Sequence, residues 1–352
     1  MRKLILSFAI LALAIVACQP SSDEIPTQET AQIDMSDFYV YTDTDASKAS
    51  NNGKEDKCHS MHVLNKQLKE NPGLENRMFN IEKHTRTFIA GKKPDKNPGN
   101  GGGNNGGGGT DPGTDPVDDG LGSINIPVYV YVVYANSSQN ISDAQINSQI
   151  SVLNADFNDT NYNDVPAEFQ SVGADVDINF TLATVDRQAN STSSWGTNNA
   201  VKSAYPAAPG HLTIWVANIG GGILGYAQFP GGAASTDGVV ISPQYFGTTG
   251  TATAPFDLGR TATHEVGHWL NLRHIWGDGR CRQDDFVADT PSSDAPNYGC
   301  PSYPTVNCKS NDMTMNYMDY TNDACMNMFS IGQKDRMRAI FSAGGARENF
   351  VN

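Results

Sequence analysis

The sequence is poor in positive charge and holds no long apolar run beyond its first residues. It has 24 Lys and Arg against 38 Asp and Glu, which gives a net charge of −14 over 352 residues. A nucleic-acid-binding protein needs a basic surface that displaces the counterions of the phosphates, so we expect no nucleic-acid partner. After residue 17 no apolar run is long enough to span a bilayer, which excludes a polytopic membrane protein.

The first eighteen residues have the pattern of an export signal. Arg2 and Lys3 precede an apolar run over residues 4–17, which is too short for a stable membrane-spanning helix. The run ends in Ile-Val-Ala-Cys, which resembles the lipobox of bacterial lipoproteins, whose Cys is lipid-modified. We predict a lipoprotein signal peptide over residues 1–17 and lipidation of Cys18, with an ordinary cleaved signal as the alternative. The protein is then exported to the outer membrane or the cell surface, and the lipid is its only membrane contact.

Composition divides the rest of the chain into four parts. Residues 18–53 are rich in Ser, Thr, Asp, Gln and Asn with little periodicity, which predicts a disordered tether. Residues 54–92 carry apolar side chains at helical spacing, broken at 71–73, which predicts two short helices. Residues 93–120 include a run in which eight of eleven residues are Gly, which predicts a flexible linker. Residues 121–352 form the main domain.

The main domain has the pattern of an α/β unit. Strands are predicted where β-branched and aromatic residues gather, and a helix where apolar residues recur every three or four positions after a Ser-Asp-Ala-Gln start. The predicted strands cover residues 126–134, 176–185, 212–217, 225–229 and 238–241, and the helix covers 142–156. This order predicts a mixed sheet backed by a helix.

Three of the seven His residues fall within eleven positions. His264 and His268 are one helical turn apart, so both rings can reach a single metal ion, and Glu265 beside them can take a proton from water on that ion. His274 can be the third ligand only if the helix ends near Asn271 and the chain turns sharply there. Asn tolerates the left-handed conformation that such a turn needs. The spacing therefore predicts a Zn²⁺ site on the three His side chains.

This motif resembles the signature of the metzincin metallopeptidases, in which a Gly stands where this chain has Asn271. The Met-containing turn that completes the signature is also present, as Met-Asn-Tyr-Met-Asp-Tyr at 315–320. The segments that resemble the pappalysin (cytophagalysin) family within the metzincins are residues 285–291, 316–326 and 332–337. The resemblance covers residues 124–345 and, more loosely, the region around Cys58.

The resemblance implies a zinc-dependent endopeptidase, made as an inactive precursor, that hydrolyses peptide bonds in proteins or peptides. Glu265 is then the general base towards a zinc-bound water, and Tyr320 stabilises the oxyanion of the tetrahedral intermediate. Met318 is the Met-turn residue, an apolar floor under the metal. The alternative is a surface-anchored binding lipoprotein whose zinc site is not catalytic. We expect a monomer.

The implied fold is α/β (α+β) and metzincin-like. It has a twisted, mixed five-stranded sheet with a backing helix and the zinc-binding helix. A smaller, loop-rich lower subdomain follows, with a C-terminal helix over residues 331–342. The active-site cleft runs between these two parts.

Four cysteines follow the zinc-binding motif. Four cysteines allow three pairings from sequence alone. The family pattern implies Cys281–Cys308 and Cys300–Cys325, which would stabilise a subdomain with little regular structure. A second zinc site on the same four residues is the alternative, although their spacing lacks a C-x₂-C.

Cys58 stands apart from these four. Its segment resembles the prosegment of bacterial pappalysins, in which a Cys thiolate takes the fourth position on the zinc, although His59 stands where the family usually has Gly. Residues 54–92 are therefore expected to form an inhibitory prosegment, with an idle thiol as the alternative. Since the lipid anchor precedes this segment and the linker follows it, cleavage within 92–118 would activate the peptidase and also free it from the membrane.

Two further predictions concern acidic residues. Asp284, Asp285, Asp289 and Thr290 place oxygen atoms in one loop, and pappalysin-like proteins can hold a structural Ca²⁺ in this region; a solvated acidic loop is the alternative. Asp323 lies in the segment after the Met-containing turn, which in this family usually walls the S1′ pocket. Its negative charge would favour Arg or Lys immediately after the scissile bond.

Overall fold

The computed structural model describes residues 33–42, 58–92, 119–160 and 164–350. The chain divides into two compact units, residues 1–34 and 35–352, and the described residues belong almost entirely to the second. The predicted signal peptide, the lipidation of Cys18 and most of the predicted linker fall outside the described residues. None of the helices in the described ranges is long and apolar enough to cross a membrane.

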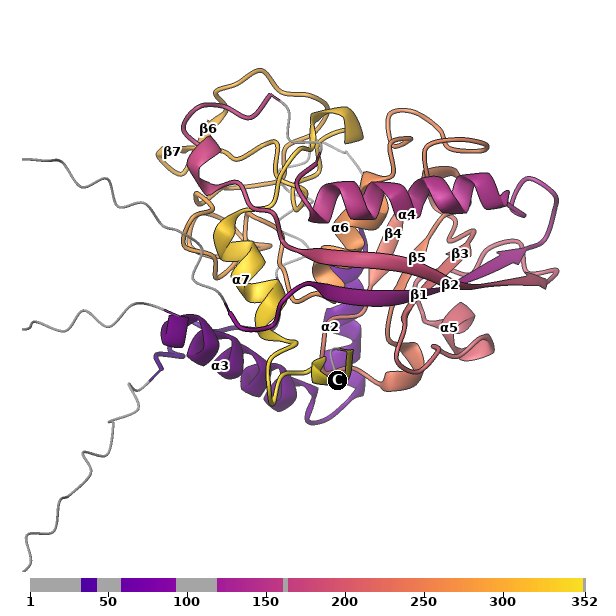
Figure 1. Ribbon diagram of the computed structural model, residues 1–352, viewed down its shortest axis with the longest axis horizontal. Coiled ribbons are helices and arrows are strands. Elements are labelled where there is room, and N and C mark those ends of the chain that lie inside the picture. Colours follow the sequence, from indigo (N-terminus) through magenta and orange to yellow (C-terminus); the bar gives the residue numbers. More distant parts are fainter. Residues whose placement is uncertain (1–32, 43–57, 93–118, 161–163, 351–352) are drawn as a thin grey trace, which may run out of the picture. The chain divides into compact units, whose positions relative to one another are not determined.

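The second unit is built on a five-stranded sheet (Figure 1). Its strands are β1 (Ile124–Tyr134), β2 (Ile178–Ala189), β3 (Leu212–Ala217), β4 (Gly225–Ala227) and β5 (Val239–Ile241). They lie in the order β2-β1-β3-β5-β4 and are parallel except for β4, which pairs antiparallel with β5 at one edge. The predicted mixed five-stranded sheet is therefore confirmed. The middle strand β3 is buried at every position, as expected of a largely apolar strand that is covered on both faces.

Helices cover both faces of this sheet. α4 (Asp143–Phe157) lies along one face, where it packs on β2 and contacts α6 (Arg260–Trp269) (Figure 1). It begins after Ser142, whose side chain accepts a hydrogen bond from the first turn, as the sequence predicts. Successive side chains of a strand point to opposite faces, so Trp215 of β3 lies on the other face, in a cluster with the short helix α5 (Ala200–Ala204).

The chain after α6 is rich in loops. Its strands are β6 (Val306–Asn307) and β7 (Ser310–Asn311), and its helix is α7 (Ile331–Ala339), shorter than predicted. The disulfides Cys281–Cys308 and Cys300–Cys325 cross-link these loops. The implied pairing is thus confirmed, and the alternative of a second zinc site on these cysteines is wrong. Short 3₁₀ turns lie at Gln170–Val172, Ala234–Thr236, Pro243–Tyr245, Asp323–Cys325 and Glu348–Phe350.

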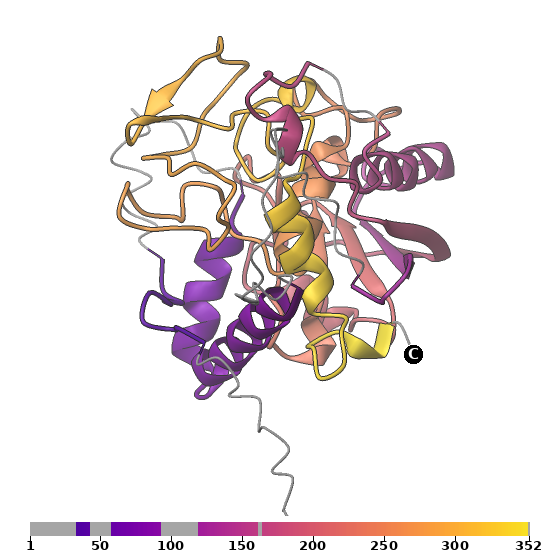
Figure 2. The ribbon, with the colours of Figure 1, turned by 60° about the vertical axis from the view of Figure 1, so that its left-hand side comes forward.

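Two helices precede the main domain. α2 (Ser60–Glu70) and α3 (Leu74–Lys92) confirm the two helices predicted between residues 54 and 92. Gly73 separates them with a φ of 90°, a conformation that favours glycine. α2 packs on β4, and α3 packs on α7 (Figure 2). Both helices therefore lie against the main domain.

Residues 35–42 belong to the segment predicted to be a disordered tether, and for these residues the prediction is wrong. Val40 is buried in an apolar cluster with residues of α2 and α3. The hydroxyl of Tyr39 donates hydrogen bonds of 2.7 Å to the carbonyls of Gly277 and Asp284. The polar composition around this short Phe-Tyr-Val-Tyr run conceals it, because the run is ordered by contacts with α2 and α3 and with carbonyls more than 200 residues further along the chain. We call residues 35–42 the N-terminal strap.

Candidate active site

Helix α6 carries two of the candidate metal ligands, and a sharp turn brings the third back to them. α6 ends at Trp269, and Asn271 has a φ of 77°, in the left-handed region. The N–H of Leu272 donates a hydrogen bond of 2.9 Å to the carbonyl of Gly267, which closes the turn. The early helix end and the left-handed Asn271 are confirmed, and together they direct His274 towards α6.

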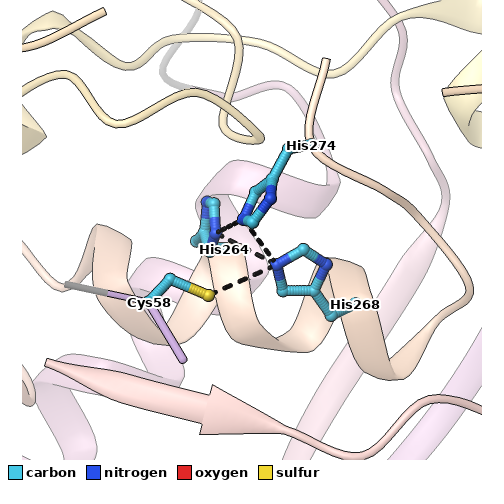
Figure 3. Close-up of side chains that lie close together, drawn as sticks. All are labelled: Cys58, His264, His268 and His274. Carbon is cyan, nitrogen blue, oxygen red and sulfur yellow. Dashed lines mark hydrogen bonds between the residues drawn. The ribbon is translucent and has the colours of Figure 1, made fainter. Parts of the chain in front are cut away.

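The three imidazole rings point towards one another through their Nε2 atoms (Figure 3). The Nε2–Nε2 distance is 3.2 Å between His264 and His268, 3.1 Å between His268 and His274, and 3.2 Å between His264 and His274. Two nitrogen ligands of a tetrahedral Zn²⁺, each at ~2.0–2.1 Å from it, lie about 3.3 Å apart. The three nitrogen atoms are therefore spaced as ligands of one ion.

The opposite ring nitrogen of each His is held by an acceptor. Nδ1 of His264 donates to the carbonyl of Tyr317 at 2.7 Å, and Nδ1 of His268 to a backbone carbonyl at 2.8 Å. Nδ1 of His274 forms a short hydrogen bond with the carboxylate of Asp278. These partners fix the proton on Nδ1 and leave the Nε2 lone pairs free for a metal. Burial lowers the pKa of His264 to about 3 and that of His268 well below its ordinary value, so both rings are neutral, as metal ligands must be.

The thiol of Cys58 completes a group of four candidate ligands. Its Sγ lies 3.5 Å from Nε2 of His268, and the thiol and the three His rings offer ligand atoms that all lie within 4.8 Å of one another (Figure 3). The thiol is free and buried. Burial, followed by the nearby carboxylate of Glu265, raises the pKa of Cys58 well above its ordinary value. The segment before α2 thus reaches the predicted zinc site.

Glu265 lies beside this group and is held by the first residue of α2. Its Oε2 accepts a hydrogen bond of 2.6 Å from the hydroxyl of Ser60, and the same hydroxyl accepts one of 2.7 Å from the N–H of Ala227 on the edge strand β4. Burial raises the pKa of Glu265 to about 7, so the carboxyl group can gain or lose a proton near neutral pH. The side chain packs so closely on β4 that a Cβ at Gly225 would lie 2.9 Å from its Cγ.

Tyr320 and Met318 contact the same part of the molecule. The Tyr320 hydroxyl donates a hydrogen bond of 3.3 Å to the carbonyl of Cys58, and its ring centroid lies 4.9 Å from that of His274. Met318 is fully buried against α6, where a Cβ at Gly267 would lie 2.5 Å from its Sδ. Met318 therefore supports the zinc-binding helix from below, and Tyr320 stands beside the His rings.

A pocket adjoins the His group, and Asp323 forms part of its wall. The lining residues are Cys58, Leu224, Phe256, Arg260, Thr261, His264, Glu265, Tyr298, Asp319, Tyr320, Thr321, Asp323 and Met326. One carboxylate oxygen of Asp323 accepts hydrogen bonds from the N–H groups of Leu258 and Arg260, at 2.9 and 3.1 Å. Its other oxygen has no hydrogen-bond partner within the described part of the chain. Burial raises the pKa of Asp323 to about 6.

The predicted Ca²⁺ ligands do not converge on one point. The hydroxyl of Thr290 lies 2.9 Å from both carboxylate oxygens of Asp285 and donates its one proton to that carboxyl group. Asp289 instead accepts hydrogen bonds from the hydroxyl of Ser330 and the N–H of Gly332, at 2.6 and 2.8 Å, where α7 begins. Burial also raises the pKa of Asp285 well above its ordinary value, which disfavours the charged form that Ca²⁺ prefers. The Ca²⁺ site stays a prediction that this arrangement does not favour.

Three residues of the site escape prediction from the sequence. The indole ring of Trp276 stacks on His274, with ring centroids 4.3 Å apart and an angle of 6° between the planes. Asp278 holds the Nδ1 of His274, and a carboxylate four residues after a His ligand is a usable sequence signal for such a role. Ser60 offers no local signal, because its partners Glu265 and Ala227 lie 205 and 167 residues away.

A His triad formed by a helix and the turn after it, with a glutamate beside it and a methionine beneath it, defines the metzincin class of zinc peptidases. Comparison with known proteins leads to the family. A family model described as Pregnancy-associated plasma protein-A matches residues 216–342. Extracellular metalloprotease 1 of Coccidioides posadasii is 37% identical over 232 residues, which are 62% of this chain and 77% of that protein. An extracellular metalloprotease of Pyricularia oryzae is 35% identical over 237 residues, 62% of this chain and 76% of that protein.

Two solved structures of mirolysin from Tannerella forsythia are similar to this chain. Mature mirolysin in complex with a cleaved peptide is 45% identical with a TM-score of 0.62, and the match covers 65% of this chain and 95% of that one. A promirolysin mutant is 37% identical with a TM-score of 0.67, and the match covers 84% of this chain and 97% of that one. The chain therefore belongs to the pappalysin family of metzincins. It is an exported, zinc-dependent endopeptidase made as a precursor, and its substrates are proteins or peptides.

Proposed function

We propose that His264, His268 and His274 hold the catalytic Zn²⁺ and that Glu265 is the general base. The convergence of the three Nε2 atoms, each on a ring whose Nδ1 is already occupied, carries this assignment. When bound, Zn²⁺ supplies a Lewis acid that activates water and polarises the scissile carbonyl. Glu265 takes a proton from the attacking water and passes it to the leaving amine. The hydroxyl of Tyr320 donates a hydrogen bond to the oxyanion.

The three residues Cys58–Ser60 keep this site inactive in the precursor. The thiol of Cys58 lies against the His rings and acts as the fourth zinc ligand in place of water. The carbonyl of Cys58 engages the hydroxyl of Tyr320, and the hydroxyl of Ser60 engages the carboxylate of Glu265. The N–H of His59 donates a hydrogen bond of 3.1 Å to the carbonyl of Gly225, so the same segment also covers the edge of β4. Each catalytic group therefore already has a partner from the prosegment.

Zinc content and peptide hydrolysis of the activated enzyme test the catalytic assignment. Glu265→Gln should retain one zinc per chain and lose hydrolysis of casein and arginyl peptides about 10²–10⁴-fold, because the general base is gone while the ligands remain. His268→Ala should lose both zinc and activity. If the wild-type enzyme binds zinc and hydrolyses nothing, the catalytic assignment is wrong and a binding lipoprotein with a non-catalytic zinc site replaces it.

Cobalt substitution of the precursor tests the role of Cys58. A thiolate ligand gives Co²⁺ an intense charge-transfer absorption in the near ultraviolet, which nitrogen and oxygen ligands do not give. The wild-type precursor should show this band, and Cys58→Ser should lose it while still binding one metal ion. His59→Gly, which restores the family's usual residue, is the matched control and should keep the band. A wild-type precursor without the band would leave Cys58 as an idle thiol.

Asp323 gives the pocket a preference for a basic residue immediately after the scissile bond. The oxygen of Asp323 that has no hydrogen-bond partner among the described residues is the acceptor for a guanidinium or ammonium group. A set of peptides that differ only at this position should show higher kcat/KM for Arg and Lys than for Leu. Asp323→Asn should remove that preference, whereas Asp257→Asn, which removes the carboxylate immediately before Leu258, should keep it. An unchanged preference in Asp323→Asn would contradict the assignment.

The precursor is a lipid-anchored monomer whose catalytic domain leaves the membrane once the linker has been cut and the prosegment has dissociated. The lipobox-like sequence before Cys18 supports the anchor. Metabolic labelling with a radioactive fatty acid should mark the wild-type precursor and not Cys18→Ser, and sedimentation should give the mass of one chain. If the Cys18→Ser variant takes up as much radioactive fatty acid as the wild type, Cys18 is not the site of lipidation.

A further inference from the structure

A carboxylate of the prosegment is buried against the catalytic domain, on a different helix from Cys58. Glu82 of α3 has an exposed fraction of 2%. Its Oε1 accepts a hydrogen bond of 3.1 Å from Nη1 of Arg336, and its Oε2 accepts one of 2.8 Å from Nη2. Arg86, one turn further along α3, adds a hydrogen bond of 2.8 Å to Oε1. Such a two-pronged contact with a guanidinium is the strong form of carboxylate recognition.

Arg336, the partner of Glu82 in the catalytic domain, lies near a second guanidinium group, that of Arg273. Arg336 lies on α7, is 2% exposed, and within the described ranges its ion pair is with Glu82. The guanidinium of Arg273 lies 5.0 Å from the centroid of the Phe286 ring and that of Arg336 lies 5.7 Å from the same centroid. Arg273 is also within electrostatic reach of the carboxylate of Asp278, whereas Arg336 forms no ion pair with a described carboxylate of its own domain.

We propose that Arg336, with Arg273 beside it, is a carboxylate-binding site of the catalytic domain that captures Glu82 and holds the prosegment separately from the zinc. Its ligand is a carboxylate presented by a helix, and its occupant is α3 of this chain. Cutting the linker then does not release the prosegment, which stays bound as an inhibitor until it dissociates or is degraded. This inference rests on the inhibitory role proposed for Cys58–Ser60.

Further contacts of α3 extend this anchor along the catalytic domain. Nε of Arg77 donates a hydrogen bond of 2.7 Å to the carbonyl of Gly231, and Nε2 of His84 lies 2.9 Å from the hydroxyl of Ser342. Leu74 of α3 is buried in the apolar cluster that α2 and α3 share with Phe229 of the main domain. None of these groups lines the pocket beside the zinc site. The contacts that hold α3 on the catalytic domain therefore lie apart from the pocket through which the metal site is reached.

Site-specific cleavage of the full-length precursor tests the proposal. A recognition sequence for a specific protease is inserted between Gly106 and Gly107, the linker is cut, and size-exclusion chromatography shows whether the prosegment co-elutes with the catalytic domain. Peptide hydrolysis is then followed as the cut protein is diluted, which yields the dissociation constant. The variants are Glu82→Gln, Arg336→Gln and both together, and Glu75→Gln, an exposed carboxylate on the same helix, is the matched control.

The wild-type prosegment should co-elute after cleavage, and hydrolysis should appear only on dilution. Glu82→Gln should raise the dissociation constant at least about 30-fold, because it leaves a buried guanidinium without its partner. Arg336→Gln should have a similar effect, the double variant should add little to either, and Glu75→Gln should leave it unchanged. Release of the wild-type prosegment on cutting, or equal binding of Glu82→Gln and wild type, would overturn the proposal.

Another variant, Cys58→Ala, distinguishes binding of the prosegment through Glu82 from inhibition by Cys58–Ser60. Cys58→Ala keeps Glu82 and should still co-elute after cleavage, even if it hydrolyses peptide before dilution. An uncut wild-type precursor that is already active would disprove inhibition by Cys58–Ser60, yet co-elution of its cut prosegment would still support the anchor. If Glu82→Gln does not fold, the cut wild-type and Arg336→Gln proteins decide the question.

Discussion

The hydroxyl of Ser60 donates a hydrogen bond of 2.6 Å to the Oε2 atom of Glu265, across a sequence separation of 205 residues. The hydroxyl oxygen of Ser60 also accepts a hydrogen bond from the N–H of Ala227. One side chain of the prosegment therefore joins the proposed general base to the edge strand β4. Both partners are buried, and neither bond exists once the prosegment has left. In the precursor, the prosegment therefore contacts the proposed general base as well as the candidate metal ligands.

Ser60→Ala should weaken the bound prosegment and leave the mature enzyme unchanged. The substitution leaves the buried N–H of Ala227 without an acceptor and Glu265 without a donor, a loss of about 1–3 kcal/mol. The dissociation constant of the cut prosegment should therefore rise by about 5- to 150-fold. Thr87→Ala is the control, because the hydroxyl of Thr87 is exposed and bonds only within α3, to Lys83. Equal constants for the Ser60 and Thr87 variants would show that the hydroxyl contributes nothing to latency.

The cut prosegment should bind more weakly at low pH, because Glu82 then becomes protonated. The guanidinium groups of Arg336 and Arg86 hold the pKa of Glu82 at about 2, below its ordinary 4.5, even though burial alone would raise it; Asp37 faces Arg86 from the strap. Because docking of the prosegment lowers the pKa of Glu82, the ionised carboxylate makes its full contribution to prosegment binding above pH 4.5. This contribution is lost as the pH falls towards 2. Linkage gives a loss of binding of about fourfold at pH 4 and about 30-fold at pH 3.

The measurement is the dissociation constant of the cut prosegment between pH 7 and pH 3. Other carboxylates also titrate in this range. The informative quantity is therefore the dissociation constant of Glu82→Gln divided by that of the wild type at each pH. The two proteins should differ most at neutral pH and approach each other in acid. A ratio that stays constant with pH would mean that Glu82 binds with an unchanged pKa.

The sequence predicts the local parts of this structure well. The zinc motif is contained in eleven residues, so its geometry follows from helix spacing and from the left-handed tolerance of Asn271. β3 has the predicted bounds because all six of its residues, five apolar and Thr213, are buried. β2 runs from Ile178 to Ala189, beyond the predicted end at 185, because its pairing with β1 continues after its own alternation fades.

Apart from the approach of Cys58 to the His group, which the family resemblance implies, the sequence does not predict contacts between distant segments. Glu82 and Arg336 are 254 residues apart, and nothing in the periodicity of either helix marks them as partners. Asp289 looked like a metal ligand because it lies in an acidic run, but the start of α7 satisfies it instead. The strap is likewise not predicted, because the carbonyls of Gly277 and Asp284 that bond to Tyr39 lie more than 200 residues further along the chain.

Gly267→Ala should destabilise the zinc-binding helix. A Cβ at this position would lie 2.5 Å from the Sδ of Met318, and both residues are buried, so Met318 has to move. We expect a net loss of about 1–3 kcal/mol in the free energy of unfolding and weaker zinc binding. Gly91→Ala is the control, since a Cβ on Gly91 of α3 meets open space and should be neutral or stabilising by up to about 1 kcal/mol. Thermal denaturation with zinc titration checks both, and a wild-type zinc affinity in Gly267→Ala would argue against support by Met318.

The two disulfides should contribute similarly to stability and differently to substrate binding. They join residues 27 and 25 positions apart, so loss of either cross-link should cost roughly 3 kcal/mol by the entropy of the unfolded chain. Cys325 ends the 3₁₀ turn that begins with Asp323 in the pocket wall, whereas neither Cys281 nor Cys308 lines the pocket.

The paired variants Cys281→Ser with Cys308→Ser and Cys300→Ser with Cys325→Ser make the comparison direct. Both should lower the Tm by a similar amount, since the two closed loops are nearly equal in length. Only the second should raise KM for peptides with Arg after the scissile bond, because only that turn carries the carboxylate of Asp323. Zinc content should stay at the wild-type level in both, since neither pair touches the His group. Equal KM values for the two variants would show that the turn keeps its shape without its disulfide, and that Asp323 is positioned by its hydrogen bonds to Leu258 and Arg260 alone.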